Sequence, residues 1–215
     1  MPVRRIPISH RSHITGTQPF ILGVRSVAHE SSLERDFVTV CRFDAEIIGV
    51  EEQPVSIYWI DANGQKRRYT PDYRVVRRAG AEIVEVKYRN DLRANWAEYK
   101  PAFVAARSWA ARQGMQFRIA TDRYIRGPFL ANARRLLPRL HDPVAAELER
   151  IILGAVTRLQ PVSLSTIAEA VITPAWPKEV VLSALWPLLA RRVLVTALDV
   201  EIDGASQVSL TGGQP

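Results

Sequence analysis

The stretch YTPDYRVVRRAGAEIVEVK, from Tyr69 to Lys87, decides the fold of the first part of the chain. Asp72 follows a proline and opens an apolar segment, a glycine-containing turn lies at 79–80, and a second apolar segment comes after it. Short β-rich runs separated by a tight turn are typical of a hairpin. The stretch therefore predicts two antiparallel strands over residues 72–77 and 81–87.

The charged residues of this hairpin predict a site. Side chains alternate along a strand, so Glu85 and Lys87 stand side by side on one face, and antiparallel pairing brings Asp72 to their level. Neighbouring carboxylates repel each other unless a cation lies between them, and hard oxygen ligands suit Mg²⁺ or Mn²⁺. A lysine beside them can align a water or stabilise developing negative charge. The arrangement favours metal-assisted hydrolysis, and the alternative is an ordinary ladder of exposed charges.

A further carboxylate is available on an amphipathic helix expected over residues 30–43. Glu34 shares a stripe with Val38 and Cys41, and a charge against apolar neighbours is costly unless it meets a cation. The alternatives are a flanking Glu34 that reaches solvent, and Glu30, one turn earlier, as the acidic ligand.

Periodicity predicts the other elements of the first part. We expect a strand over residues 53–60 with a reversal at 61–64, and a strand over 117–120. Between them we expect a helix over 101–113 with Phe103, Val104 and Ala110 facing inward. This order indicates an α/β fold in which helices pack on a mixed sheet.

Length and charge indicate two domains. A chain of 215 residues with 47% hydrophobic content can bury one full core and a second small one. Its net charge of +7 favours a polyanionic partner, and residues 1–142 hold 24 Lys and Arg against 15 Asp and Glu. The proline-bracketed segment LLPRLHDP, residues 136–143, coincides with the end of this basic part. We expect a basic arm (1–24), a larger domain (25–138) and a small domain (143–212).

Several classes of protein are disfavoured. The apolar runs are too short to span a bilayer and the Arg-rich start lacks a signal peptide's apolar stretch, so we expect a cytoplasmic protein without a membrane partner. The single cysteine, Cys41, cannot form an internal disulfide, and the four histidines show no zinc-ligand spacing. Cys41 is expected in the core.

The small domain is expected to be winged-helix-like. Helical periods cover residues 148–159, 163–171 with Ser163 as a cap, and 177–191, and a hairpin is expected from 194–202 and 207–210. Residues 143–215 hold 5 Lys and Arg against 7 Asp and Glu, which favours a protein partner over DNA. A domain that merely packs on its neighbour is the alternative.

The motifs resemble a known family. Pro71-Asp72 followed by Glu85-Val86-Lys87 is similar to the PD-(D/E)XK nuclease signature, which implies a restriction-endonuclease-like core. The segments HESSLERDFVTVCRFDAEIIGVEEQPVSIYW, YTPDYRVV, IVEVKYR and FRIATDRYIR resemble, in order and spacing, the catalytic domain of TnsA. TnsA is the endonuclease subunit of heteromeric cut-and-paste transposases, and the resemblance covers roughly residues 20–137.

The resemblance implies an activity, a cofactor and partners. Mg (or Mn) would be held by Glu34, Asp72 and Glu85 with the Val86 carbonyl as an extra ligand, and Lys87 would be the catalytic lysine. The enzyme would nick double-stranded DNA at the transposon's 5′ ends while a DDE-type transposase cuts the 3′ ends. Its carboxyl-terminal domain would engage an AAA+ ATPase regulator, and the protein would be nucleoid-associated when bound to DNA.

Basic residues are expected to contact the DNA, although the amino-terminal arm could instead be disordered in the free protein. They are Arg4, Arg5, Arg11, Arg67, Arg68 and Arg89. The alternatives to the TnsA-like function are a free-standing restriction or repair nuclease and a non-catalytic DNA-binding adaptor. The intact acidic set with its lysine disfavours the adaptor.

Overall fold

The computed structural model describes residues 16–19, 26–29 and 31–212, with side chains from residue 31 onward. The chain divides into two compact units, Met1–Arg126 and Gly127–Pro215. Of the helices within these ranges, none is long and apolar enough to cross a membrane.

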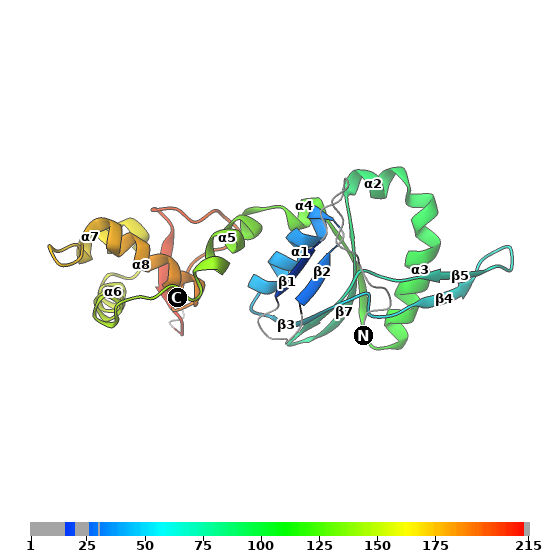
Figure 1. Ribbon diagram of the computed structural model, residues 1–215, viewed down its shortest axis with the longest axis horizontal. Coiled ribbons are helices and arrows are strands. Elements are labelled where there is room, and N and C mark those ends of the chain that lie inside the picture. The colour runs from blue at the N-terminus through cyan, green and yellow to red at the C-terminus, as the bar shows by residue number, and fades with distance from the viewer. Residues whose placement is uncertain (1–15, 20–25, 30, 213–215) are drawn as a thin grey trace. The chain divides into compact units, whose positions relative to one another are not determined.

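The first unit is built on a four-stranded mixed sheet (Figure 1). Its strands lie in the order β3 (Ile47–Glu52), β6 (Tyr73–Arg77), β7 (Gly80–Lys87) and β8 (Gln116–Thr121). β6 pairs antiparallel with both β3 and β7, whereas β8 runs parallel to β7. A parallel neighbour needs a crossover connection, which includes the helix α3 (Trp96–Arg112). The expected mixed sheet flanked by helices is confirmed.

The two faces of the sheet carry different helices (Figure 1). One face packs against α1 (Ser32–Phe43) in an apolar cluster that includes Phe37, Cys41, Val84 and Val86. Cys41 is 1% exposed, as expected of a core residue. On the other face, α3 inserts Phe103, whose ring centroid lies 5.6 Å from that of Phe117 on β8.

The strand expected over residues 53–60 is shorter than predicted and lies outside the main sheet. β3 ends at Glu52, and within 53–60 only Ile57–Ile60 form a strand, β4, which pairs with β5 (Lys66–Tyr69) in a separate two-stranded hairpin. Gln53 has a φ of 43°, and Pro54 after it has no N–H to donate, so the strand is interrupted there.

The expected reversal between these strands is confirmed. The Asp61 carboxylate accepts hydrogen bonds from the backbone N–H groups of Asn63 and Gln65, both at 2.9 Å. Gly64 has a φ of +75°, a region that favours glycine.

Helix α3 begins five residues before the expected helix and contains Pro101. Phe103 and Ala110 are buried as expected, but Val104 is 55% exposed, so its inward assignment is wrong. The apolar stripe of α3 instead passes through Phe103, Ala106 and Ala110, which recur at helical spacing.

Short elements complete the first unit. A hairpin of β1 (Gly16–Pro19) and β2 (Ser26–His29) lies partly in the expected basic arm. The helices α2 (Arg89–Ala94) and α4 (Asp122–Ile125) follow β7 and β8 respectively. None of these four elements was predicted from periodicity.

The second unit combines helices with a small antiparallel sheet of strand order β10-β11-β9. Its elements are α5 (Pro128–Leu136), a 3-10 turn (Leu137–Arg139), α6 (Ala146–Leu159), β9 (Val162–Ser163), α7 (Leu164–Val171), α8 (Lys178–Ala190), β10 (Leu194–Val195) and β11 (Gln207–Leu210). Ser163 caps α7 as expected, because its hydroxyl accepts a hydrogen bond from the Thr166 N–H at 3.1 Å.

Helix α5 belongs to the second unit, so the compact units divide before α5 and not at the expected segment 136–143. The buried Asn132 side chain donates to the carbonyls of Leu198 and Val200 and accepts from the N–H of Ile202. Arg135 donates to the Ile202 carbonyl at 2.7 Å. These bonds to α5 engage the backbone beyond Val195, and the expected strand over 194–202 is accordingly only two residues long.

Candidate active site

Asp72 and the end of β7 meet as the hairpin register requires. Tyr73 pairs with Val84, which places Asp72 level with Glu85. The carboxylate Oδ2 of Asp72 accepts a hydrogen bond from the backbone N–H of Val86 at 2.8 Å. This bond fixes the half-buried carboxylate at the end of β7, beside the residues with which it was expected to lie.

Glu85 is a buried carboxylate, 4% exposed, with a partner for each oxygen. Lys87 Nζ lies 2.9 Å from Oε1, and the Tyr69 hydroxyl donates a short hydrogen bond to Oε2. Burying a charge is costly unless it is paired and hydrogen-bonded, and Glu85 is both. Tyr69 thus joins β5 to the site.

The site holds more negative than positive charge. Burial raises the pKa of Asp72 well above its usual range, Glu85 and Glu34 raise it further, and Lys87 and the Val86 N–H only partly offset them. Burial lowers the pKa of Lys87, but Glu85 and Asp72 outweigh this and raise it above its ordinary value. Two carboxylates, Asp72 and Glu85, therefore interact with one lysine that stays charged, and Glu34 adds further negative charge beside Asp72.

Glu34 reaches the same region from the first turn of α1. The helix begins after Ser31, whose hydroxyl accepts from the Glu34 N–H and donates to Glu34 Oε1, both at 3.2 Å. The Tyr73 hydroxyl donates to Glu34 Oε2 at 3.4 Å. The alternative ligand, Glu30, lies outside the described residues.

Two tyrosines of the site were missed from the sequence. Tyr69 precedes Pro71-Asp72, and Tyr73 follows them, so both were close to the predicted carboxylate. Tyr73 is 1% exposed and belongs to the apolar cluster that packs against α1. Burial raises its pKa well above the usual range, and the negative charges of Glu34 and Asp72 raise it further. The only available signal was position, because an aromatic residue on a strand is usually part of the core.

The carboxylates do not form a ready metal cage. Within the part of the chain that the structure describes, no three Asp, Glu, His or Cys side chains gather closely enough to hold a metal ion. The oxygens of Glu85 are engaged by Lys87 and Tyr69, and those of Glu34 by Ser31 and Tyr73.

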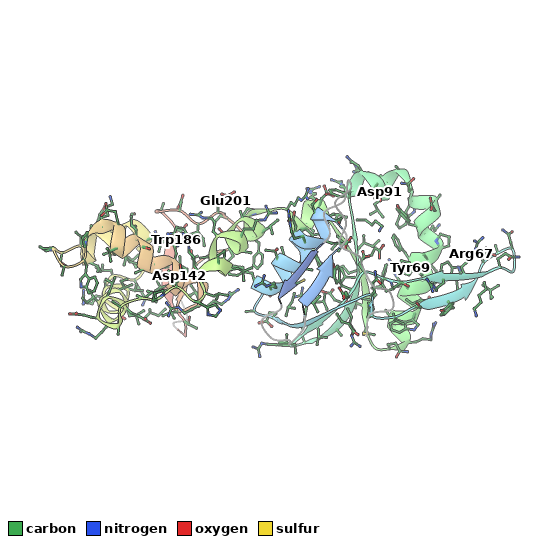
Figure 2. The ribbon with its side chains drawn as sticks, in the orientation of Figure 1. Arg67, Tyr69, Asp91, Asp142, Trp186 and Glu201 are labelled. Carbon is green, nitrogen blue, oxygen red and sulfur yellow. The ribbon has the colours of Figure 1, made fainter. Side chains whose placement is uncertain are left out.

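The arginines expected at DNA lie in different settings. Arg67 and Arg68 are exposed on β5, and Figure 2 shows Arg67 further out along the hairpin than Tyr69. Arg67 Nε lies 2.7 Å from Asp61 Oδ2. Arg89 begins α2, where its backbone N–H donates to Asp122 at 2.6 Å. The three arginines at positions 4, 5 and 11 lie outside the described residues.

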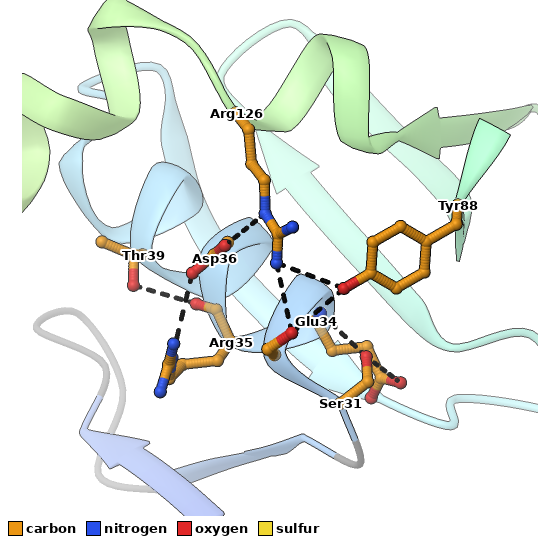
Figure 3. A network of polar contacts seen from close by, with 8 residues as sticks. Ser31, Glu34, Arg35, Asp36, Thr39, Tyr88 and Arg126 are labelled. Carbon is orange, nitrogen blue, oxygen red and sulfur yellow. Dashed lines mark hydrogen bonds and ion pairs between the residues drawn. The ribbon is translucent and has the colours of Figure 1, made fainter. Parts of the chain in front are cut away.

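A second buried carboxylate lies on α1, near the site (Figure 3). Asp36 is 1% exposed, and Arg126 Nε donates to it at 2.8 Å. The same guanidinium donates to the Ser32 and Tyr88 hydroxyls at 3.1 and 3.2 Å, and these hydroxyls are 3.0 Å apart. The network ties α1 to the residue after Lys87, and no sequence signal connected Asp36 with a residue ninety positions away.

Comparison with known families agrees with the expected resemblance. Residues 44–122 match the family model of the TnsA-like endonuclease N terminal domain. The matched range contains Asp72, Glu85 and Lys87, and Glu34 precedes it. No curated protein matches the sequence. Residues 44–122 are therefore similar to a TnsA-like endonuclease N-terminal domain.

Proposed function

We propose that the protein is the metal-dependent DNA endonuclease subunit of a heteromeric transposase. It nicks the 5′ ends of a transposon in double-stranded DNA, and a partner DDE-type transposase cuts the 3′ ends. The observation that carries this proposal is the cluster of Asp72, Glu85 and Lys87 at the end of β7, inside the TnsA-like domain.

Mg or Mn suits the donor set of this cluster. The side chains of Asp72, Glu85 and Glu34 would have to move closer together to hold the ion with the Val86 carbonyl, and all four supply the hard oxygens that these cations prefer. Burial and then repulsion from Glu85 and Glu34 raise the pKa of Asp72, and a divalent cation would offset both. When bound, the ion supplies Lewis-acid activation of the phosphodiester and of water.

The residues of the chain prepare the site for this chemistry. The Val86 N–H holds Asp72, and Tyr69 with Lys87 holds Glu85, so both carboxylates are oriented before DNA arrives. Lys87 carries a positive charge and has three N–H donors, with which it can align the attacking water or stabilise the phosphorane-like charge. Its ammonium also lies 5.7 Å from the centroid of the Tyr99 ring on α3.

For the second unit we propose a winged-helix-like domain that binds a protein partner, the AAA+ ATPase regulator. The order α6, β9, α7, α8, β10, β11 supports this proposal, because it combines three helices with a small antiparallel sheet. Helix α8 offers little phosphate contact, because Lys178 is its single cation and Glu179 lies beside it.

Cleavage by an Asp72→Ala variant tests the enzyme proposal. In single-turnover nicking of a transposon-end duplex with Mg²⁺ and the partner transposase, we expect no cleavage. Duplex affinity should be equal or higher, because the change removes a negative charge. Asp199→Ala, at an exposed position in the second unit, is the matched control and should cut normally. Normal cutting by Asp72→Ala would overturn the site, and wild-type protein that binds but never cuts would support an adaptor.

A further inference from the structure

The β4–β5 hairpin has two unlike faces. Residues directly opposite each other in an antiparallel pair project to the same side, so Tyr58 pairs with Arg68 and Ile60 with Lys66 on one side. We call these four residues the outer face. The pairs of Ile57 with Tyr69 and of Trp59 with Arg67 occupy the opposite, inner face.

The inner face is anchored in the first unit. Ile57 is 2% exposed, and the Tyr69 ring centroid lies 6.1 Å from that of Phe103 on α3. Trp59 lines a hollow together with Pro101 and Val104 of α3, and Ile60 at the end of β4 also contributes to it. Because Tyr69 also bonds Glu85, the orientation of the hairpin is fixed relative to the candidate active site.

The outer face is exposed and keeps its cations unneutralised. Tyr58 is 55% and Ile60 is 65% exposed, although both are large apolar residues. Lys66 Nζ lies 5.0 Å from the centroid of the Tyr58 ring. Within residues 31–212, neither Lys66 nor Arg68 forms an ion pair, whereas Arg67 on the other face pairs with Asp61. This contrast between adjacent arginines argues against a uniformly solvated charged strand.

The chemistry of the outer face fits duplex DNA. Lys66 and Arg68 stand two residues apart, about 6.6 Å along the strand, which equals about two base-pair rises measured along the DNA helix axis. A two-stranded ribbon fits the major groove, where apolar side chains can contact thymine methyl groups. The residues of the first unit also carry the excess positive charge, with 21 Lys and Arg against 14 Asp and Glu over 1–126.

We propose that the outer face of the hairpin is a duplex-DNA contact. Lys66 and Arg68 bind phosphates, and Tyr58 with Ile60 contacts bases and sugars between them. The proposal rests on the proposed function in one respect: DNA held there is presented to the site because the inner face of the same hairpin ends at Glu85. Of the two arginines expected at DNA on β5, it assigns contact to Arg68 and a structural role to Arg67.

The test measures binding alone, using the full chain and a fluorescently labelled duplex in EDTA. Anisotropy titrations over a range of salt concentrations give the affinity and its salt dependence. Arg68→Ala should weaken binding by about three- to tenfold and reduce the salt slope by about one, the value for one lost phosphate contact. Lys66→Ala should do the same. Arg67→Ala, the matched control on the same strand, should change affinity less than about twofold because Asp61 already neutralises Arg67.

A variant of Tyr58 separates the contribution of uncharged contacts from that of the two cations. Tyr58→Ala should weaken binding by a similar factor at every salt concentration without altering the slope, since an uncharged contact releases no counterions. Thermal melting of each variant checks that the hairpin has kept its fold. Wild-type affinity and slope for both Lys66→Ala and Arg68→Ala would overturn the proposal and leave the outer face to a protein partner. Equal losses for Arg67→Ala and Arg68→Ala would overturn the assignment of faces.

Failure of the proposed function would look different. If Asp72→Ala still nicks DNA while the outer-face variants lose affinity, the nuclease site is wrong and the DNA contact stands. If nicking depends on Asp72 while those variants bind normally, the contact is wrong and the nuclease stands.

Discussion

The two compact units differ in charge and in the polar groups that they bury. Residues 1–126 carry 21 Lys and Arg against 14 Asp and Glu, whereas residues 127–215 carry 8 of each. Among the described side chains, the first unit buries Asp36, Thr39 and Glu85, and the second buries the amide of Asn132. The Asn132 side chain forms its hydrogen bonds with the backbone of its own unit. Among the residues that the structure describes, buried carboxylates occur only in the unit that contains the candidate site.

The two buried carboxylates of the first unit also differ from each other. Asp36 meets an arginine whose guanidinium is further bonded to two hydroxyls, so its charge is balanced. Glu85 has one lysine, which it shares electrostatically with Asp72. A balanced pair stabilises an arrangement of helices, whereas a surplus of negative charge marks a place where a cation can bind.

Among the variants that test this difference between Asp36 and Glu85, Lys87→Arg is expected to have the largest effect on DNA nicking. If Lys87 only screened the carboxylates, arginine would serve nearly as well, but a bulkier planar guanidinium cannot align a water in its place. We expect single-turnover nicking with Mg²⁺ and the partner transposase to fall on the order of a hundredfold or more. The melting temperature should hardly change.

Lys100→Arg is the matched control, an exposed lysine on α3 that should tolerate the exchange. Near wild-type cleavage by Lys87→Arg would reduce Lys87 to a counter-ion. A large fall in melting temperature would return the end of β7 to a structural role.

The next effect concerns stability and separates Asp36 from Glu85. Asp36→Ala leaves Arg126 without its carboxylate, and because Arg126 is 41% exposed it can return partly to water. We expect a loss of about 2 kcal/mol in the free energy of unfolding, less than for a fully buried pair. Chemical denaturation measures it.

Arg35→Ala is the control, since Arg35 approaches Asp36 only to 3.8 Å and should cost no more than about 0.5 kcal/mol. Glu85→Gln keeps an acceptor for Tyr69 and should lose nicking while losing less stability than Asp36→Ala. Equal destabilisation by Asp36→Ala and Glu85→Gln would remove the distinction between a balanced pair and a functional surplus.

A smaller effect is expected from Tyr69→Phe, which removes the hydroxyl from Glu85 and leaves the ring on Phe103. Groups that orient a ligand typically contribute tenfold or more to activity, so we expect about a tenfold fall in nicking. If the variant also needs a higher Mg²⁺ concentration to reach its half-maximal rate, the Tyr69 hydroxyl acts by positioning Glu85. Tyr99→Phe is matched, because Tyr99 also packs on Phe103 but donates to Asp91. Equal losses from the two variants would assign the effect to packing.

The sequence predicted what is local and missed what is not. Asp72, Glu85 and Lys87 lie on one hairpin, whose alternation and register follow from a few residues. By contrast, β3 carries Gly49 and two glutamates and has no strong strand pattern of its own, so its pairing with β6 is decided by the whole sheet. The bonds of Tyr69 to Glu85 and of Arg126 to Asp36 depend in the same way on tertiary packing.

The domain boundary shows the same limit. The prolines and charges at 136–143 favoured a domain boundary in that segment. However, α5, which precedes it, is hydrogen-bonded through Asn132 to the backbone of residues 198–202. A contact between segments so distant in sequence leaves no periodic signal. The helix therefore belongs to the second unit although its arginines suggested the basic part.

The smallest effect is expected from separating the two units. A fragment of residues 1–126 keeps the whole excess of positive charge, whereas residues 127–215 have none. Its duplex affinity should therefore stay within about twofold of that of the full chain, with the same salt slope.

A fragment that ends at residue 140 is the informative comparison. This fragment contains α5 but lacks the segments that α5 packs against, so it exposes side chains that are buried in the second unit, namely Leu130, Ala133 and Leu136. It should therefore aggregate or melt less cooperatively than the shorter fragment. Anisotropy and thermal melting of both fragments make the measurement. Tighter DNA binding by residues 127–215 than by 1–126 would break the comparison between a charged catalytic unit and a neutral one, because net charge would then no longer say which unit meets the DNA.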